Sequence, residues 1–177
     1  MSYRYEVFNT FVNYYIIYSK TKLLTMGLMS FFKGVGEKLF GHKEEAAPVA
    51  EKEELKASAL LAHVQQLGLA FNSLTIKTSG DTVSLIGEVD AQADSEKIAL
   101  AVGNVEGVHV VDNQLVVATP EPEATYHTVE KGDTLSKIAK TVYGDAMKYP
   151  VIFEANKPML SHPDKIYPGQ VLRIPAL

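Results

Sequence analysis

The sequence predicts an α+β protein made of two small modules joined by a short linker. Helical and strand periodicities follow one another in the order αββαβ over residues 50–118 and in the order βααβ over residues 125–177. Between them, residues 119–124 contain two prolines in six positions, a composition that favours extended chain. A chain of 177 residues is long enough for two such domains, each with its own core.

An amphipathic helix over residues 51–67 opens the first module. Residues 74–78 and 82–89 alternate between apolar and polar and flank a Ser-Gly-Asp turn, as in a β-hairpin. Asp90 is placed to cap a second helix, and residues 108–117 predict a third strand. The apolar positions of the second helix are Ile98, Ala101, Val102 and Val105. Two helices are therefore expected on one face of a small mixed sheet.

The second module begins with a strand over residues 126–129. Asp133 or Thr134 is expected to cap the helix that follows. Pro150 suits the first turn of a further helix, and residues 171–174 predict the final strand. The core face of the first of these helices is predicted to be Leu135, Ile138, Ala139 and Val142.

The composition excludes several classes of function. Cysteine is absent, so the chain has neither a disulfide nor a thiolate metal site. A formal net charge of −4 argues against a nucleic-acid partner, since phosphate binding needs clustered Lys and Arg. The motif G-x-S-x-G does not occur, and the 5 histidines are never three to five positions apart, as local metal-ligand pairs are. We therefore expect a non-enzymatic protein without catalytic residues.

Residues 1–25 differ from the rest of the chain in composition. They hold five of the 9 tyrosines and no Gly or Ala. Their longest uncharged run, residues 7–19, includes two asparagines, whereas a membrane-spanning helix needs about 20 apolar residues. An acidic residue precedes the apolar run, which is not the pattern of a signal peptide. An over-extended start, a disordered tail and an interfacial anchor remain as interpretations, and none is a membrane span.

We expect the mature protein to begin at or near Met26, because the composition changes there and the over-extended start is the interpretation we favour. An intact-mass measurement of the natively expressed protein tests this expectation. A mass that includes residues 1–25 would show instead that the longer start is used.

Residues 26–49 are predicted to form an N-terminal arm and linker. Phe31, Val35 and Leu39 recur at helical spacing, although Gly34 and Gly36 weaken a regular helix. We expect a short amphipathic arm that packs on the first module.

Two runs in the first module, VSLIGEV and GNVEGVHVVDNQLVV, carry a family resemblance. With the length of the helix between them, they resemble a BON domain over about residues 51–118. BON domains are usually binding modules, often of the cell envelope. The resemblance therefore implies a binding role and no catalytic residue.

Two runs in the second module, V-x-x-G-D-T-L-S-x-I-A and I-Y-P-G-Q-x-L-x-I-P, resemble a LysM domain over residues 126–175. LysM domains commonly bind N-acetylglucosamine-containing glycans in a shallow groove between two loops. The resemblance implies an alternative binding site here, at Gly132, Asp133, Thr134, Leu135, Asn156, Ile166, Tyr167, Pro168 and Gly169. Each of these residues also suits a structural role as a cap, a turn or an apolar contact, and we favour those roles over glycan contact.

From Met26 onward, the whole arrangement resembles the small bacterial potassium-binding proteins of the BON–LysM type. The runs EKGDTLSKIAK, FEANKPML, PDKIYPGQVLRIP and AVGNVEGV carry this resemblance. It implies a potassium ion held by the main-chain carbonyls of Phe32, Lys33, Val35, Gly103, Val105 and Val108. Carbonyl dipoles replace the water shell of this weakly hydrated cation, whereas calcium prefers several carboxylates. The arm departs from the family pattern at Gly34 and Val35. Main-chain ligands do not require particular side chains, although the extra glycine is expected to loosen the arm.

The resemblance implies a cytoplasmic potassium-binding protein, with the potassium ion as its cofactor, that senses ionic stress or modulates the response to it. The alternative is an envelope adaptor that binds peptidoglycan or another glycan through the LysM groove. Export of the N-terminus would favour the glycan. We expect the LysM module to dock on the BON module within the chain, while the sequence identifies no protein partner.

Two expectations concern single residues of the ion site. Val105 should tolerate changes of side chain that keep the path of the backbone, because only its carbonyl is used. Gly103 should end the second helix with a positive φ, so that a β-branched residue there would strain the backbone.

Overall fold

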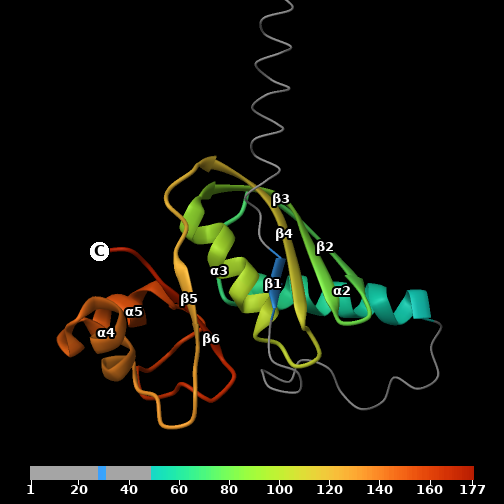
Figure 1. Ribbon diagram of the computed structural model, residues 1–177. Coiled ribbons are helices and arrows are strands. Elements are labelled where there is room, and N and C mark those ends of the chain that lie inside the picture. The colour runs from blue at the N-terminus through green and yellow to red at the C-terminus, as the bar shows by residue number, and fades with distance from the viewer. Residues whose placement is uncertain (1–27, 31–48) are drawn as a thin grey trace, which may run out of the picture.

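The computed structural model describes residues 28–30 and 49–177. A four-stranded sheet with helices α2 (Val49–Gln66) and α3 (Gln92–Gly103) forms the first module. A two-stranded sheet with helices α4 (Leu135–Tyr143) and α5 (Tyr149–Ala155) forms the second. Figure 1 shows the modules side by side, with α3 next to the strand β6 (Val171–Ile174) of the second module. The fold is of the predicted α+β class.

The strands of the first sheet lie in the order β1-β4-β3-β2. β2 (Ser73–Ser79) pairs antiparallel with β3 (Thr82–Ala91), and β3 pairs in parallel with β4 (Val110–Thr119) across the α3 connection. β1 (Leu28–Ser30) belongs to the N-terminal arm and pairs antiparallel with β4. The sequence did not predict β1, because three residues are too few to show a period. The helical pattern expected over residues 31–39 lies outside the described residues.

One face of this sheet carries the core of the first module. Val83, Leu85 and Val89 alternate along β3 and are completely buried. They belong to the same apolar cluster as Leu60 and Val64 of α2 and most of α3. Both helices therefore cover one face of the mixed sheet, as the hydrophobic periodicity predicts.

Gly87 in β3 is required by the close approach of β2. Its φ is +150°, and a Cβ atom on it would lie 2.1 Å from the main-chain oxygen of Ser73. No side chain fits at that distance, so only glycine allows Leu74 and Gly87 to face each other in the ladder.

The second module places α4 and α5 beside the antiparallel pair of β5 (Thr125–Thr128) and β6. Thr134 caps α4, since its hydroxyl accepts a hydrogen bond from the Lys137 N–H at 3.2 Å. Pro150 lies in the first turn of α5, as predicted. A 3₁₀ turn, η1 (Ala146–Lys148), separates the two helices. The buried residues of α4 are Leu135, Ile138 and Ala139.

Three details of the predicted helices are wrong. Asp90 does not cap α3: it lies in β3 and accepts a hydrogen bond from the side chain of Asn72 at 2.8 Å, while Ala91 precedes α3 without a side-chain cap. Val105 lies beyond α3, which ends at Gly103, because the following loop turns its apolar residues into the same core. Val142 is 47% exposed, while Tyr143 of the same turn packs against the core of the second module.

Candidate functional site

The loop of residues 104–109 connects α3 to β4 and, with Gly103, holds three of the predicted ion ligands. The N–H groups of Asn104 and Val105 donate to the carbonyls of Leu100 and Val102, which closes the last turn of α3. The N–H of Val108 donates to the carbonyl of Val105 at 3.2 Å, which folds the loop back on itself. The carbonyls at a helix C-terminus carry partial negative charge, so this loop suits a cation.

The side chains of Val105 and Val108 point into the core of the first module and are 0% and 1% exposed. These values are for the whole residues, so the main-chain atoms of Val105 and Val108 are covered as well. The same burial corrects the expectation that Val105 tolerates changes of side chain. A larger or polar residue at this position would disturb the packed core.

The expectation for Gly103 is also wrong. It is the last helical residue of α3 and is not among the glycines with positive φ. Gly107, four residues later, has a φ of +87°. The left-handed residue that the turn requires thus lies within the loop and not at the helix end.

Replacing Gly107 by Val is expected to lower the free energy of unfolding by about 1–3 kcal/mol, because a β-branched residue is strained at positive φ. A Cβ atom would meet nothing within 4 Å, so backbone strain and not steric overlap sets the cost. Urea unfolding measures the change. Gly107→Asn is the control, since Asn tolerates the left-handed region better. Equal stability of the Val variant and the wild type would contradict the prediction.

The N-terminal arm lies against the start of β4, immediately after this loop. Ser30 faces Val110 and Leu28 faces Asp112 in the β1–β4 pair. The three remaining predicted ligands, Phe32, Lys33 and Val35, lie outside the described residues. The structure therefore brings β1 of the arm next to the start of β4, which follows the loop directly.

The loop is anchored at three points by residues distant in sequence. The side-chain amide of Asn104 makes two hydrogen bonds to the main chain of Val171 in β6. Nδ2 of Asn104 donates to the Val171 oxygen at 3.0 Å, and the Val171 N–H donates to Oδ1 of Asn104 at 2.9 Å. The ammonium of Lys56 donates to the Gly107 oxygen. The N–H of His109 donates to the main-chain oxygen of Asp81 at 2.8 Å. Sequence reasoning missed these anchors, because no local pattern links partners up to 67 positions apart.

A buried ion pair joins the two modules. Glu96 of α3, 2% exposed, accepts a hydrogen bond from Nε of Arg173 in β6 at 2.6 Å. Its other oxygen accepts from the N–H of Ala124 and from the side chain of Gln92, both at 3.0 Å. The end of the linker, α3 and β6 thus meet at one carboxylate, and Val171 extends the core of the first module.

The predicted glycan groove brings its two loops together, but several of its residues have structural roles. The N–H of Gly169 donates to the carbonyl of Val129 at 2.8 Å, which links the second loop to the strand end before the first. Leu135 is 2% exposed and belongs to the core. Asn156 is equally buried, and its side chain bonds the main chain of Ile152 and Arg173.

Asp133 also has a structural role in that groove. The N–H of Glu130 and the ring of His127 bond its carboxylate at 2.9 and 2.8 Å and hold its pKa below the usual range. The residues of the predicted groove that reach the surface, fully or in part, are Gly132, Asp133, Thr134, Ile166, Tyr167, Pro168 and Gly169.

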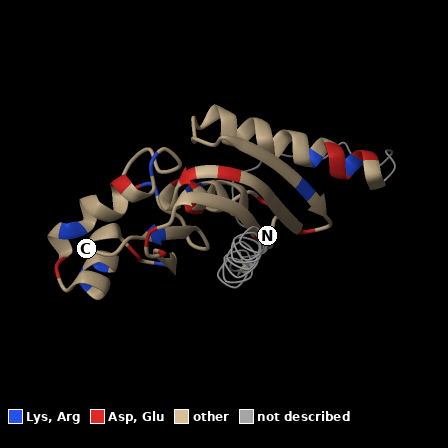
Figure 2. Ribbon diagram, turned by 90° about the horizontal axis from the view of Figure 1, so that it is seen from above, with Lys and Arg blue, Asp and Glu red and all other residues tan. Residues whose placement is uncertain are grey.

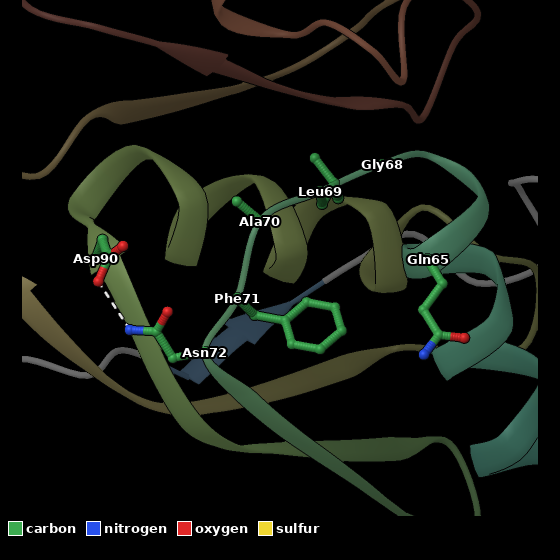
Figure 3. Close-up of a pocket in the computed structure, with 7 residues that line it drawn as sticks. All are labelled: Gln65, Gly68, Leu69, Ala70, Phe71, Asn72 and Asp90. Carbon is green, nitrogen blue, oxygen red and sulfur yellow. Dashed lines mark hydrogen bonds between the residues drawn. The ribbon is translucent and has the colours of Figure 1, made fainter.

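A further hollow lies at the opposite end of β3 from the loop (Figure 3). Phe71 and Gln65 line it, and the hydrogen bond between Asn72 and Asp90 crosses one side. It is open to solvent and contains none of the predicted site residues.

Side chains that ligate metals are not gathered elsewhere in the described chain. Within residues 28–30 and 49–177, no group of three or more His, Cys, Asp or Glu is placed to hold a metal ion. No helix among the same residues is long and apolar enough to cross a membrane.

These features define a two-module protein of the α+β class. The model of the BON domain family matches residues 53–119, and that of the LysM domain family matches residues 127–175. The chain is 44% identical over 151 residues to the potassium binding protein Kbp of Escherichia coli O6:H1, a match that covers 85% of this chain and 99% of that protein. The chain belongs to the BON–LysM family of Kbp, which confirms the predicted resemblance.

A second relative is a Deinococcus radiodurans protein described as uncharacterized. It is 37% identical over 131 residues, which cover 67% of this chain and 51% of that protein.

Proposed function

We propose that this chain is a potassium-binding protein that holds the ion with main-chain carbonyls of its arm and of the α3–β4 loop. The carbonyls are those of Phe32, Lys33, Val35, Gly103, Val105 and Val108. The name of the relative from Escherichia coli supports the choice of ion. In this proposal the protein binds and does not catalyse, acts in the cytoplasm, and senses ionic stress or modulates the response to it.

The observation that carries the proposal is the antiparallel pairing of β1 with β4. Ser30 faces Val110, so the chain after Ser30 and the chain before Val110 leave the sheet at the same end. Phe32 follows Ser30 by two positions, and Val108 precedes Val110 by two. Two residues of extended chain span about 7 Å. The pairing therefore supports a site in which carbonyls of the arm and carbonyls of the loop surround one ion.

Potassium suits these donors better than a small divalent cation does. It is large and weakly hydrated, and a ring of carbonyl dipoles can replace its water. Calcium and magnesium sites usually include several carboxylates. The acidic residues near the loop include Glu106, Asp112 and Asp81, whose carboxylate lies 3.0 Å from Nδ1 of His109. Within the described residues, no three acidic or histidine side chains are placed to hold a metal ion. The side chains of Val105 and Val108 are apolar and lie in the core, so these two residues can offer only their main-chain oxygens.

Isothermal titration of the full chain with KCl, in a potassium-free buffer balanced with choline chloride, tests the proposal. We expect saturable binding of KCl, competition by RbCl, whose cation is close to potassium in size, and little heat from NaCl or MgCl₂. An absence of potassium binding, or equal binding of sodium, would refute the proposal.

The LysM module supports a second candidate function, glycan binding in the envelope. The surface residues of its two adjoining loops are the observation in its favour. Titration with chitin oligomers separates the candidates. Because the buried members of the groove serve the fold, we expect weak binding or none, whereas tight binding together with export would favour the glycan.

A further inference from the structure

Lys56 lies in the N-terminal half of α2, where most of the charged residues of that helix gather (Figure 2). Its ammonium donates to two main-chain oxygens, that of Gly80 at 2.6 Å and that of Gly107 at 3.2 Å. Gly80 is in the turn between β2 and β3, and Gly107 is in the α3–β4 loop, 51 positions from Lys56. One cation therefore joins three segments that are far apart in the sequence.

Neighbouring contacts fix the geometry of this cation. Oε1 of Glu53, one turn earlier on α2, accepts from the N–H of Gly80 at 3.0 Å. Side chains of α2 therefore bond both the N–H and the carbonyl of Gly80. Next to Gly80, the oxygen of Asp81 accepts from the N–H groups of His109 and Val110. The β2–β3 turn thus holds the end of the α3–β4 loop in place through the main-chain oxygen of Asp81.

Chemically, this contact resembles the proposed ion site. An ammonium group ligated by carbonyl oxygens makes the same kind of interaction as a potassium ion in a carbonyl ring. The Gly107 oxygen belongs to the loop that carries Val105 and Val108, but it accepts its hydrogen bond from Lys56 of the protein itself.

We propose that Lys56 is a positioning residue whose ammonium acts as a built-in cation and holds the α3–β4 loop in the form that binds potassium. The inference rests on the proposed function, because it concerns the same loop. Without this cation, the Gly107 carbonyl loses a charged donor, and the loop keeps only its anchors at Asn104 and His109 until the ion binds. Part of the binding free energy would then be spent on ordering.

The test compares potassium titrations of wild type, Lys56→Met, Lys56→Arg and Lys52→Met. Met matches the length of Lys but has neither the charge nor the donors, and we expect it to weaken potassium binding by about threefold to tenfold, as for the loss of a partly exposed charged hydrogen bond. Arg keeps a charged donor and should restore most of the affinity. Lys52→Met makes the same change of net charge one turn earlier on α2 and should bind as the wild type does. Thermal unfolding without potassium checks that each variant is folded.

Each outcome decides the inference separately from the proposed function. If the wild type does not bind potassium, the proposed function fails. If the wild type binds but Lys56→Met binds as tightly or more tightly, the positioning role is refuted. An equal loss of potassium affinity in Lys52→Met would show that the change of net charge, and not the contact of Lys56 with the loop, causes the weaker binding, and would refute the positioning role. An equal loss in Lys56→Arg would show that a cation on these carbonyls is not what the loop requires.

Discussion

Deletion of residues 26–36 is expected to lower the potassium affinity by at least about 100-fold, or about 2.7 kcal/mol. The deletion removes the proposed carbonyls of Phe32, Lys33 and Val35, and with them β1, which pairs with β4 next to the loop. The carbonyls of the loop would then have to share the ion with water. Calorimetric titration with KCl measures the loss.

Two controls make this result specific. Deletion of residues 1–25 should leave the affinity unchanged, because no proposed ligand lies there. Lys33→Ala should also bind nearly as the wild type does, because it keeps the main-chain carbonyl. Circular dichroism should show that the arm deletion still folds, since the cores of both modules lie in residues 49–177. Unchanged potassium binding after removal of the arm would place the site elsewhere.

Glu96→Ala is expected to lower the free energy of unfolding by about 3–5 kcal/mol, the usual cost of leaving one partner of a buried ion pair alone. Arg173, whose side chain is 11% exposed, would lose the carboxylate that lies 2.6 Å from its Nε. The N–H of Ala124 would lose the same acceptor group. We expect looser contact between the modules and faster proteolysis within residues 119–124.

Glu154→Ala is the matched control, because Glu154 forms an ion pair of similar length, 2.7 Å, with Lys157. That pair is exposed, with side chains 63% and 46% accessible, so its loss should cost no more than about 0.5 kcal/mol. Urea unfolding of both variants gives the comparison. A loss below about 1 kcal/mol in Glu96→Ala would mean that Glu96 and Arg173 do not hold the modules together.

The arrangement of the site gives the family motifs a physical meaning. In the run AVGNVEGV, Gly103 ends α3, Asn104 bonds β6, Val105 enters the core and Gly107 takes the positive φ of the turn. The run thus ends a helix, docks the LysM module and turns the chain at Gly107 toward β4. Such roles in the fold do not require that a residue of the run touch the ligand with its side chain.

Local patterns in the sequence are enough to predict the α+β class, the order of the two modules and most of the element bounds. The physical reason is that apolar residues recur with the period of the element that buries them, as Val83, Leu85 and Val89 do in β3. Local rules also placed Thr134 and Pro150 correctly, because capping and first-turn geometry depend on near neighbours in the chain.

The way the candidate site is held depends on how the whole chain packs. A main-chain carbonyl is present at every residue, so no side-chain pattern marks the few that could face an ion. Gly103 and Gly107 look alike in the sequence, and the path of the loop decides which one has positive φ. The anchors from Lys56 and Asn104, like the pair of Glu96 and Arg173, join positions 51 to 77 residues apart, and such partners meet only when the whole chain has packed.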